Sequence, residues 1–332
     1  MNFRIGPVWL LLCTLSLSLL QAQEELELEL YSVEDGLSQR NVFKVKQDPR
    51  GFIWVATLSG LNQFDGYRFR QFTPDSRRYP LPVEQVEDLY IEDAQTLWLS
   101  SDNQLIRYHP YRQKSRRINT YPKDTSDSRI KVRNHLIGMD SSGLLITTQA
   151  ENRTRLLVRK VKDNGRVMPL TALPKPDHRQ RVCQLNGFLF SGSEGAEIRR
   201  LTARGDSLSS IPIPARRSLA ALQAVGDTSV VALMDDYTLW QMKTQEDQLH
   251  RISLPPLPTR PDFPPETFLM DRQGDIWLAG PDQLWRYSFL QKNWDNYFPQ
   301  LRQLTKVSPQ IRQIYQDLTG VYWLATDFGL VK

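Results

Sequence analysis

The stretch GFIWVAT, Gly51–Thr57, decides the fold because it recurs along the chain at a nearly constant distance. Close copies are QTLWLSS, GDIWLA and GVYWLAT, at Gln95–Ser101, Gly274–Ala279 and Gly320–Thr326. Weaker copies, in which another apolar residue replaces the tryptophan, are at Gly143–Thr148, Gly187–Gly192 and Ser229–Leu233. The marker positions are Trp54, Trp98, Ile146, Phe190, Val231, Trp277 and Trp323, spaced 44, 48, 44, 41, 46 and 46 residues apart. Seven units of this length predict a β-propeller, whose four-stranded blades take ~40–45 residues each.

Each unit also contains four short segments with the pattern of β-strands. In the first unit these are Val42–Lys46, Phe52–Thr57, Leu61–Phe64 and Tyr67–Phe72, separated by turn sequences such as Asp-Pro-Arg-Gly and Asp-Gly. No segment has a sustained helical period. The sequence therefore predicts an all-β fold, a seven-bladed propeller of four-stranded blades.

The two ends of the chain complement each other. Leu26–Tyr31 alternates strictly between apolar and polar residues, as a strand does, but no blade precedes it. The seventh unit has its first two strands at Ile311–Tyr315 and Val321–Thr326, and is cut short inside its third at Gly329–Lys332. We expect the N-terminal strand to pair with this last blade, because closing the ring removes an exposed edge.

The first 22 residues have the pattern of a cleaved signal peptide. Arg4 precedes an apolar run at Val8–Leu20, and small and polar residues follow at Gln21–Gln23. We therefore expect residues 23–332 to form the propeller and the protein to be periplasmic; retention of the segment as an uncleaved anchor is the alternative. Cys183 is then the single cysteine left, so no internal disulfide is expected, and we interpret it as a small buried apolar residue.

Three segments resemble the repeat of the two-component regulator propeller family. They are Glu34–Gln39, Gly51–Thr57 and Gly60–Gly66. The resemblance is close in units one, six and seven and loose in units three to five. It implies the N-terminal propeller of a periplasmic sensor of a bacterial hybrid two-component system. Many such receptors sense oligosaccharides, and a second propeller, a β-sandwich, a membrane helix and a histidine kinase or diguanylate cyclase usually follow. Downstream sensor and output domains would then be the partners of this chain, and it would meet a membrane only through them.

No pattern in the sequence predicts catalysis, a metal or a cofactor. The four histidines, His109, His135, His178 and His250, fall in different units, which is unlike the local spacing of zinc ligands. Gly192–Gly195 is one residue short of a nucleophile elbow. We therefore expect no enzyme activity in this chain, although a catalytic triad assembled from distant loops stays open.

Aspartates recur at the turn between the first and second strands, mostly with glycine three residues later. We interpret them as turn caps rather than calcium ligands, since an aspartate can accept hydrogen bonds from its own turn and glycine adopts the left-handed conformation. These residues are Asp48, Asp93, Asp140, Asp271 and Asp317.

The long connections from one blade to the next are expected to form one face of the disc. They are Thr73–Glu84, Tyr121–Asn134, Thr171–Arg181, Pro212–Ser218, Leu254–Pro265 and Pro299–Pro309. They are rich in lysine and arginine, and arginine pairs well with carboxylates and sulfates. We expect an acidic oligosaccharide to bind there; solvated loop charge in a protein of net charge +5 is the alternative. The candidate ligand-binding residues are Arg77, Arg78, Arg129, Lys131, Arg179, Arg181, Arg216 and Arg217.

Three function classes are consistent with the sequence. The first is a ligand-sensing propeller, the second a propeller-fold carbohydrate-active enzyme, and the third a scaffold for protein–protein contacts. Nucleic acid is not expected as a partner, because no basic-aromatic recognition motif is present. A homodimer is left open.

Overall fold

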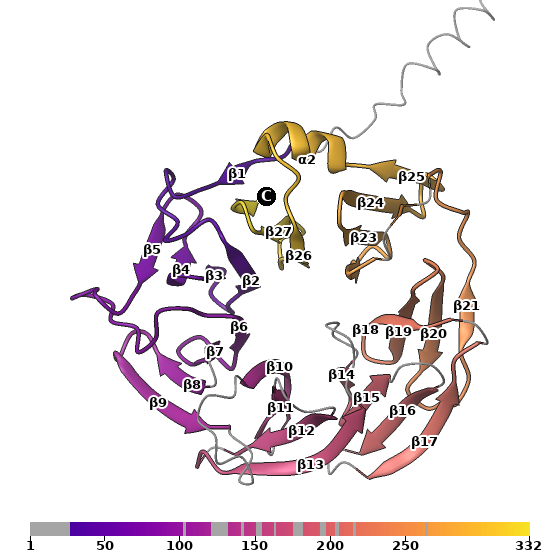
Figure 1. Ribbon diagram of the computed structural model, residues 1–332, viewed down its shortest axis with the longest axis horizontal. Helices are drawn as coiled ribbons and strands as arrows, with labels where there is room; N and C mark the ends of the chain where they lie inside the picture. Colours follow the sequence, from indigo (N-terminus) through magenta and orange to yellow (C-terminus); the bar gives the residue numbers. More distant parts are fainter. Residues whose placement is uncertain are drawn as a thin grey trace, which may run out of the picture.

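The computed structural model describes residues 27–101, 104–120, 132–140, 143–150, 155–162, 164–174, 182–192, 197–202, 206–214, 217–259, 261–262 and 265–332. Within these ranges, seven four-stranded antiparallel sheets form a ring (Figure 1). This confirms the predicted all-β fold and the number of blades. The expected signal peptide, residues 1–22, lies outside the described residues.

The sheets follow one another along the chain, and each runs from an inner to an outer strand. Blade 1 contains β2 (Val42–Gln47), β3 (Ile53–Thr57), β4 (Gly60–Phe64) and β5 (Phe69–Phe72). Blade 2 contains β6 (Asp88–Ile91), β7 (Leu97–Ser101), β8 (Gln104–His109) and β9 (Lys114–Asn119). Blade 3 contains β10 (Val132–Asp140), β11 (Gly143–Ala150), β12 (Arg155–Val161) and β13 (Val167–Pro174). Blade 4 contains β14 (Val182–Leu185), β15 (Phe188–Gly192), β16 (Glu197–Thr202) and β17 (Ser207–Pro212).

Blades 5 and 6 have the same order, and blade 7 combines both ends of the chain. Blade 5 contains β18 (Leu219–Val225), β19 (Ser229–Met234), β20 (Leu239–Lys243) and β21 (His250–Ile252). Blade 6 contains β22 (Thr267–Met270), β23 (Ile276–Gly280), β24 (Gln283–Ser288) and β25 (Asn293–Asn296). Blade 7 contains β26 (Ile311–Gln316), β27 (Tyr322–Thr326), β28 (Leu330–Val331) and β1 (Leu30–Tyr31).

The N-terminal strand closes the ring, as predicted. Leu30 pairs with Val331 and Tyr31 pairs with Leu330, and β28 pairs in turn with β27. Beyond the strand, Glu29 and Lys332 exchange two backbone hydrogen bonds of 2.9 and 2.8 Å. The closing strand is shorter than the expected Leu26–Tyr31, and its pairing leaves blade 7 with four strands like the other blades.

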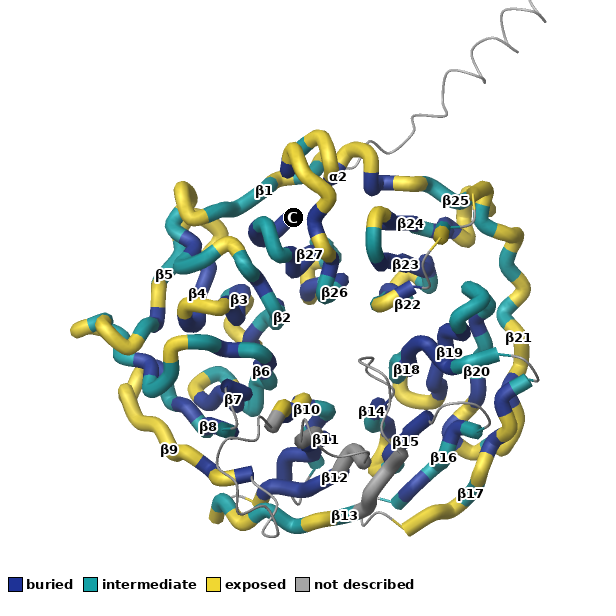
Figure 2. The backbone as a smooth tube through the Cα atoms, in the orientation of Figure 1, coloured by how far each residue is buried: buried dark blue, intermediate teal, exposed yellow. Residues whose placement is uncertain are grey.

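The hydrophobic core lies between adjacent blades, and the seven marker residues all belong to it. Trp54 of blade 1 packs with Leu89 and Leu97 of blade 2, and Trp323 of blade 7 packs with Val55 of blade 1. All seven markers are at most 3% exposed, and Figure 2 shows buried residues running through the middle strands of each blade. Each blade therefore buries its faces against its neighbours, which explains why the repeat is sufficient to define the fold.

Four of the five recurring aspartates cap their turns, as predicted: Asp48, Asp93, Asp271 and Asp317. All of these except Asp93 also accept a hydrogen bond from the marker tryptophan, and the turn after Asp140 lies outside the described residues. In blade 6, Asp271 accepts hydrogen bonds from the backbone of Gln273 and Asp275, and its Oδ2 accepts one from Trp277 Nε1 at 3.2 Å. Blades 1 and 7 repeat this pattern around Asp48 and Asp317. Among the described residues, no group of three His, Cys, Asp or Glu side chains could hold a metal ion.

One helix was not predicted. α2 (Phe298–Thr305) lies in a segment expected to be a loop, and Figure 1 shows it at the rim beside β1 and β25. Its eight residues are too few for a visible period, and it is stabilised by packing: Phe298 and Leu301 are buried on blades 6 and 7. No helix in the described parts of the chain is long and apolar enough to cross a membrane.

Two other predicted loops also begin or end differently. The loop expected to start at Thr171 is strand as far as Pro174, and the loop expected to end at Asn134 gives way to β10 at Val132. Blade 3 therefore has the longest strands, between seven and nine residues each.

Candidate functional site

The main cavity is the central channel of the ring, with a volume of about 1340 Å³. The inner strands of all seven blades line it: β2, β6, β10, β14, β18, β22 and β26. Figure 2 shows these strands around the centre of the ring. The side chains of these strands that line the channel form the candidate site.

The inner strands β2 and β26, like β18, carry an irregularity near their first residue. The pairing of β2 with β3 shifts between Val42 and Lys44, and that of β26 with β27 shifts between Ile311 and Gln313. The extra residues are Phe43 and Arg312, and both line the channel. Bulges of this kind redirect side chains, and here they bring the Arg312 guanidinium to 4.7 Å from the Phe43 ring centroid.

The charge of Arg312 has neutral partners. Its Nη1 donates to the carbonyl of Val42 at 3.0 Å and to the side-chain oxygen of Asn41. Burial lowers the pKa of Arg312, and the charge of Asp327 opposes this effect. One mouth of the channel, between blades 7 and 1, therefore carries a partly desolvated guanidinium.

Deeper in the same wall, Asp88 of blade 2 interacts with side-chain and backbone hydrogen-bond donors of blades 1, 2 and 3. It lies 3.6 Å from Lys44 Nζ and 3.8 Å from His135 Nδ1, and it accepts backbone hydrogen bonds from Leu89 and Leu136. Burial acts to raise the pKa of Asp88, but Lys44, His135 and the Leu136 amide together lower it to about 2. Asp88 is therefore ionised and fixed in place, and it joins three inner strands.

Lys46 lies against an aromatic ring rather than a carboxylate, although it is only two residues from Lys44 on β2. Its ammonium lies 5.2 Å from the ring centroid of Tyr315 on β26. Burial lowers the pKa of Lys46 to about 8; repulsion from Lys44 adds to this effect, and attraction to Asp88 opposes it. Burial also raises the pKa of the Tyr315 hydroxyl, which accepts a hydrogen bond from the Gln47 amide.

The opposite wall of the channel is mostly neutral. Blades 4 and 5 contribute small or apolar residues such as Cys183, Leu222 and Ala224, and the body of β22 continues this surface. Burial raises the pKa of Cys183 to about 12, which agrees with its interpretation as a small apolar residue. Gln223 joins blades 5 and 6 here, since its amide both donates to and accepts from the backbone of Met270. Two charged residues of the lining, Glu266 and Arg272, lie near the two ends of β22.

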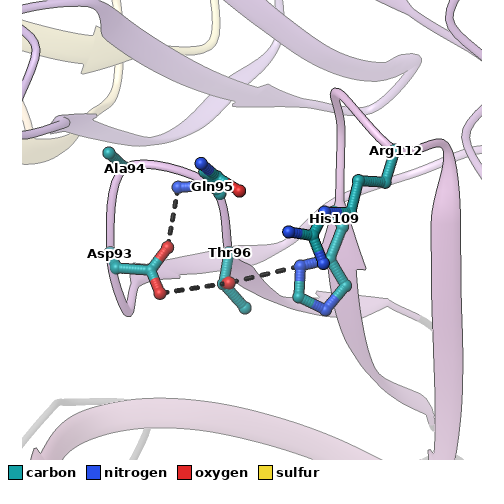
Figure 3. Close-up of a pocket in the computed structure, with 6 residues that line it drawn as sticks. All are labelled: Asp93, Ala94, Gln95, Thr96, His109 and Arg112. Carbon is teal, nitrogen blue, oxygen red and sulfur yellow. Dashed lines mark hydrogen bonds between the residues drawn. The ribbon is translucent and has the colours of Figure 1, made fainter.

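A second, smaller hollow of about 340 Å³ lies at the first turn of blade 2. Figure 3 shows Asp93 accepting hydrogen bonds from the Gln95 amide and from Thr96 Oγ1, which also lies 3.2 Å from His109 Nδ1. Arg112 points into the same hollow. The side chains of Asp93, Thr96 and His109 are linked to one another in this way, and we interpret the hollow as the space beside a capped turn.

Three of the eight predicted ligand-binding cations lie within the described residues, and the structure does not bring them together. Arg77 and Arg78 are exposed in the connection from blade 1 to blade 2, which projects from the outer rim in Figure 1. The Arg78 carbonyl accepts a hydrogen bond from Gln113 Nε2. Arg217 precedes β18 on the other side of the ring, where it pairs with Asp236 at 2.7 Å and lies over Trp240. The remaining candidates lie outside the described residues: Arg129, Lys131, Arg179, Arg181 and Arg216.

Sequence reasoning missed the charged wall of the channel. Phe43, Lys44 and Lys46 were used only as evidence for a strand, and Asp88 and Arg312 were not singled out. A signal was present, because Lys44 and Lys46 stand at alternate positions of a strand that a propeller places innermost. Two lysines on the same face of an inner strand predict a charged channel wall.

Comparison with known proteins agrees with the fold. No protein-family model matches the sequence. A segment of 36 residues, 11% of this chain, is 53% identical to Histidine kinase P4 of Formosa agariphila, and it makes up 3% of that protein.

Solved structures match over nearly the whole chain. The extracellular domain described as part of hybrid two component system BT3049 of B. thetaiotaomicron aligns with a TM-score of 0.62 at 16% identity over 92% of this chain. The corresponding domain of BT4673 from the same organism gives 0.61 at 17% over 92%. The WD40 β-propeller domain of Doa1 gives 0.59 at 10% over 89%. This chain spans 41% and 39% of the two B. thetaiotaomicron chains and 92% of the Doa1 domain. The resemblance to the two-component regulator propellers is thus confirmed for the fold.

Proposed function

We propose that this chain is the ligand-sensing propeller of an extracytoplasmic bacterial receptor. One observation carries the proposal: 92% of the chain aligns with extracellular domains of two-component signalling systems. In the proposed receptor, residues 1–22 direct export to the periplasm, and further sensor and output domains receive the signal. The match with the Doa1 domain shows that fold alone does not select this function, so the proposal depends on a binding test.

The ligand we propose is an oligosaccharide with acidic groups, bound on the face formed by the connections between blades. Arginine and lysine on these connections would pair with its carboxylates or sulfates. The described geometry counts against three of the eight candidates. Arg217 already has a carboxylate partner, and Arg77 and Arg78 project at the rim, so the proposed contacts concentrate on Arg129, Lys131, Arg179, Arg181 and Arg216.

The test is thermal unfolding of the protein with a panel of neutral and acidic oligosaccharides at low and moderate salt. A ligand that binds only the folded state stabilises it by mass action and so raises the melting temperature. At a hundredfold excess over Kd the free energy of unfolding rises by about 2.7 kcal/mol. We expect stabilisation by acidic sugars that weakens with salt and is lost on combining Arg129→Ala, Lys131→Ala and Arg179→Ala. Arg251→Ala, an exposed arginine on the outer strand β21, is the matched control and should leave the shift unchanged.

The other function classes give different results in the same experiment. Cleavage of a sugar in the panel would identify a carbohydrate-active enzyme instead. Such an enzyme commonly needs one carboxyl group protonated as a general acid, and Asp88 is unsuited to that role because its pKa is lowered to about 2. Binding to protein partners alone, with no response to any sugar, would favour a scaffold and overturn the proposal.

A further inference from the structure

We propose that the central channel binds a small organic anion, whose carboxylate pairs with the ammonium of Lys46 while the neutral wall of blades 4 to 6 faces the rest of the molecule. This site is separate from the face formed by the connections between blades. It does not depend on the proposed sensor function.

The first reason is a charge imbalance in the channel wall. Among the residues that the structure describes, Asp88 is the carboxylate whose charge acts on Lys46, and it already pairs with Lys44 at 3.6 Å. No described carboxylate lies within ion-pair distance of Lys46. Its recorded partner is the face of Tyr315, which is a weaker substitute for an anion.

The second reason is that Lys46 is partly desolvated. Burial, with repulsion from Lys44, lowers the pKa of Lys46 to about 8, so the folded protein holds this charge at a cost. A partly desolvated ammonium without an anion is unfavourable, and a bound carboxylate would compensate it. Arg312 extends the same positive wall toward one mouth, since its recorded hydrogen bonds go to neutral oxygens.

The third reason is the shape and composition of the channel. Its volume of about 1340 Å³ is more than a small molecule needs, and ligand sites typically combine an apolar lining with a few placed polar groups. Tyr315 and Phe43 offer aromatic surfaces next to the positive groups, and Leu222 and Leu269 lie on the neutral wall. This pattern fits a carboxylate attached to a compact, uncharged body.

The experiment is calorimetric titration of the full chain at pH 7 with acetate, benzoate and benzamide. Benzamide has nearly the shape of benzoate but no charge. We expect benzoate to bind at least tenfold more tightly than benzamide, because a hydrogen bond to an ionised group is the stronger kind. Lys46→Met should weaken benzoate binding by about 10- to 100-fold, and Lys46→Arg should retain it. Lys162→Met, at an exposed lysine of the blade 3 outer turn, is the matched control and should have no effect.

The pH dependence gives a second, independent readout. The wild-type affinity for benzoate should fall about tenfold between pH 7 and pH 9, because Lys46 loses its proton through about pH 8. Lys44 and Asp88 act on its charge, Tyr315 lies against it, and His135 lies beyond Asp88. On the flanking strands β6 and β26, Tyr90 and Arg312 line the same channel. Lys46→Arg keeps all of these but cannot lose its own charge, so its affinity should stay constant over the same range.

Three results would each overturn the proposal. The first is that neither acetate nor benzoate binds at about 10 mM, a concentration that detects even a millimolar Kd. The others are that benzamide binds as tightly as benzoate, or that Lys46→Met binds benzoate like the wild type. Melting temperatures of the variants show whether each is folded. If Lys46→Met does not fold, the pH profiles of the wild type and of Lys46→Arg decide, since loss of folding in one variant cannot produce a difference between those two.

Discussion

Blades 1, 6 and 7 differ from blades 3 to 5 in the chemistry of the first turn, although all six have the same four-stranded sheet. In blades 1, 6 and 7 an aspartate caps the turn and accepts a hydrogen bond from the marker tryptophan. The distances from Oδ2 to Nε1 are 3.0, 3.2 and 2.8 Å at Asp48, Asp271 and Asp317. The turn and the core are therefore joined by one carboxylate.

Blades 3 to 5 lack this link and replace it in different ways. In blade 3 the marker is Ile146, and Asp140 instead pairs at 2.6 Å with Lys160, a residue of the third strand. In blade 4 the turn is a two-residue hairpin in which Asn186 and Gly187 both have positive φ angles. In blade 5 the turn contains Asp227, whose side chain is exposed. Strand pattern and inter-blade packing therefore define the blade, while the aspartate–tryptophan link reinforces it locally.

The largest effect should come from the core position that both groups share. Phe190→Ala in blade 4 should destabilise the protein by about 3–5 kcal/mol, as much as Trp54→Ala in blade 1, because both side chains are almost fully buried. Urea unfolding followed by far-ultraviolet circular dichroism measures the difference. Leu208→Ala, at a 49% exposed leucine of blade 4, is the control and should cost less than about 0.5 kcal/mol. A cost below about 1 kcal/mol for Phe190→Ala would mean that the buried marker residue does not stabilise the loosely matching blades as it does blade 1.

The next-largest effect, removal of the aspartate in the first turn, should distinguish blades 1, 6 and 7 from blades 3 to 5. Asp271→Ala should cost about 3 kcal/mol, because it removes an acceptor from two backbone amides, from Trp277 and from the Tyr322 hydroxyl at 2.6 Å. Asp227→Ala, in the corresponding turn of blade 5, should change the stability by less than about 0.5 kcal/mol. The same urea midpoints compare them. Equal costs at the two positions would contradict the role given to the carboxylate.

Most of the fold could be predicted because a propeller repeats its evidence. The marker spacing and the complementary ends both pointed to seven blades, and the closure through Leu30 and Tyr31 followed from them. Other features were out of reach for physical reasons. The pairing of Asp140 with Lys160 depends on cross-strand register, and α2 depends on a surface offered by two other blades.

The candidate site was harder to predict because side-chain direction decides it. Whether Phe43 and Arg312 reach the channel depends on a bulge in each strand, which no residue pattern announced. The positive loops were visible in the sequence, but the partner of Arg217 comes from a turn 19 residues later. Composition therefore located charge along the chain without showing which charges are already neutralised.

The smallest predicted effect tests whether the two kinds of turn depend on the same backbone feature. Gly187 in the blade 4 hairpin and Gly274 in the blade 6 turn have φ angles of 77° and 92°, and neither has an atom within 4 Å of the place where a Cβ would be. Gly187→Ala and Gly274→Ala should therefore each cost about 1 kcal/mol, set by the left-handed backbone alone. Gly187→Asn should recover part of the loss, since asparagine tolerates this conformation better than alanine. Urea midpoints again give the values. A clearly larger cost at Gly274 would show that the Asp271 carboxylate requires its glycine to hold the turn, and the link between turn and core would then be cooperative rather than local.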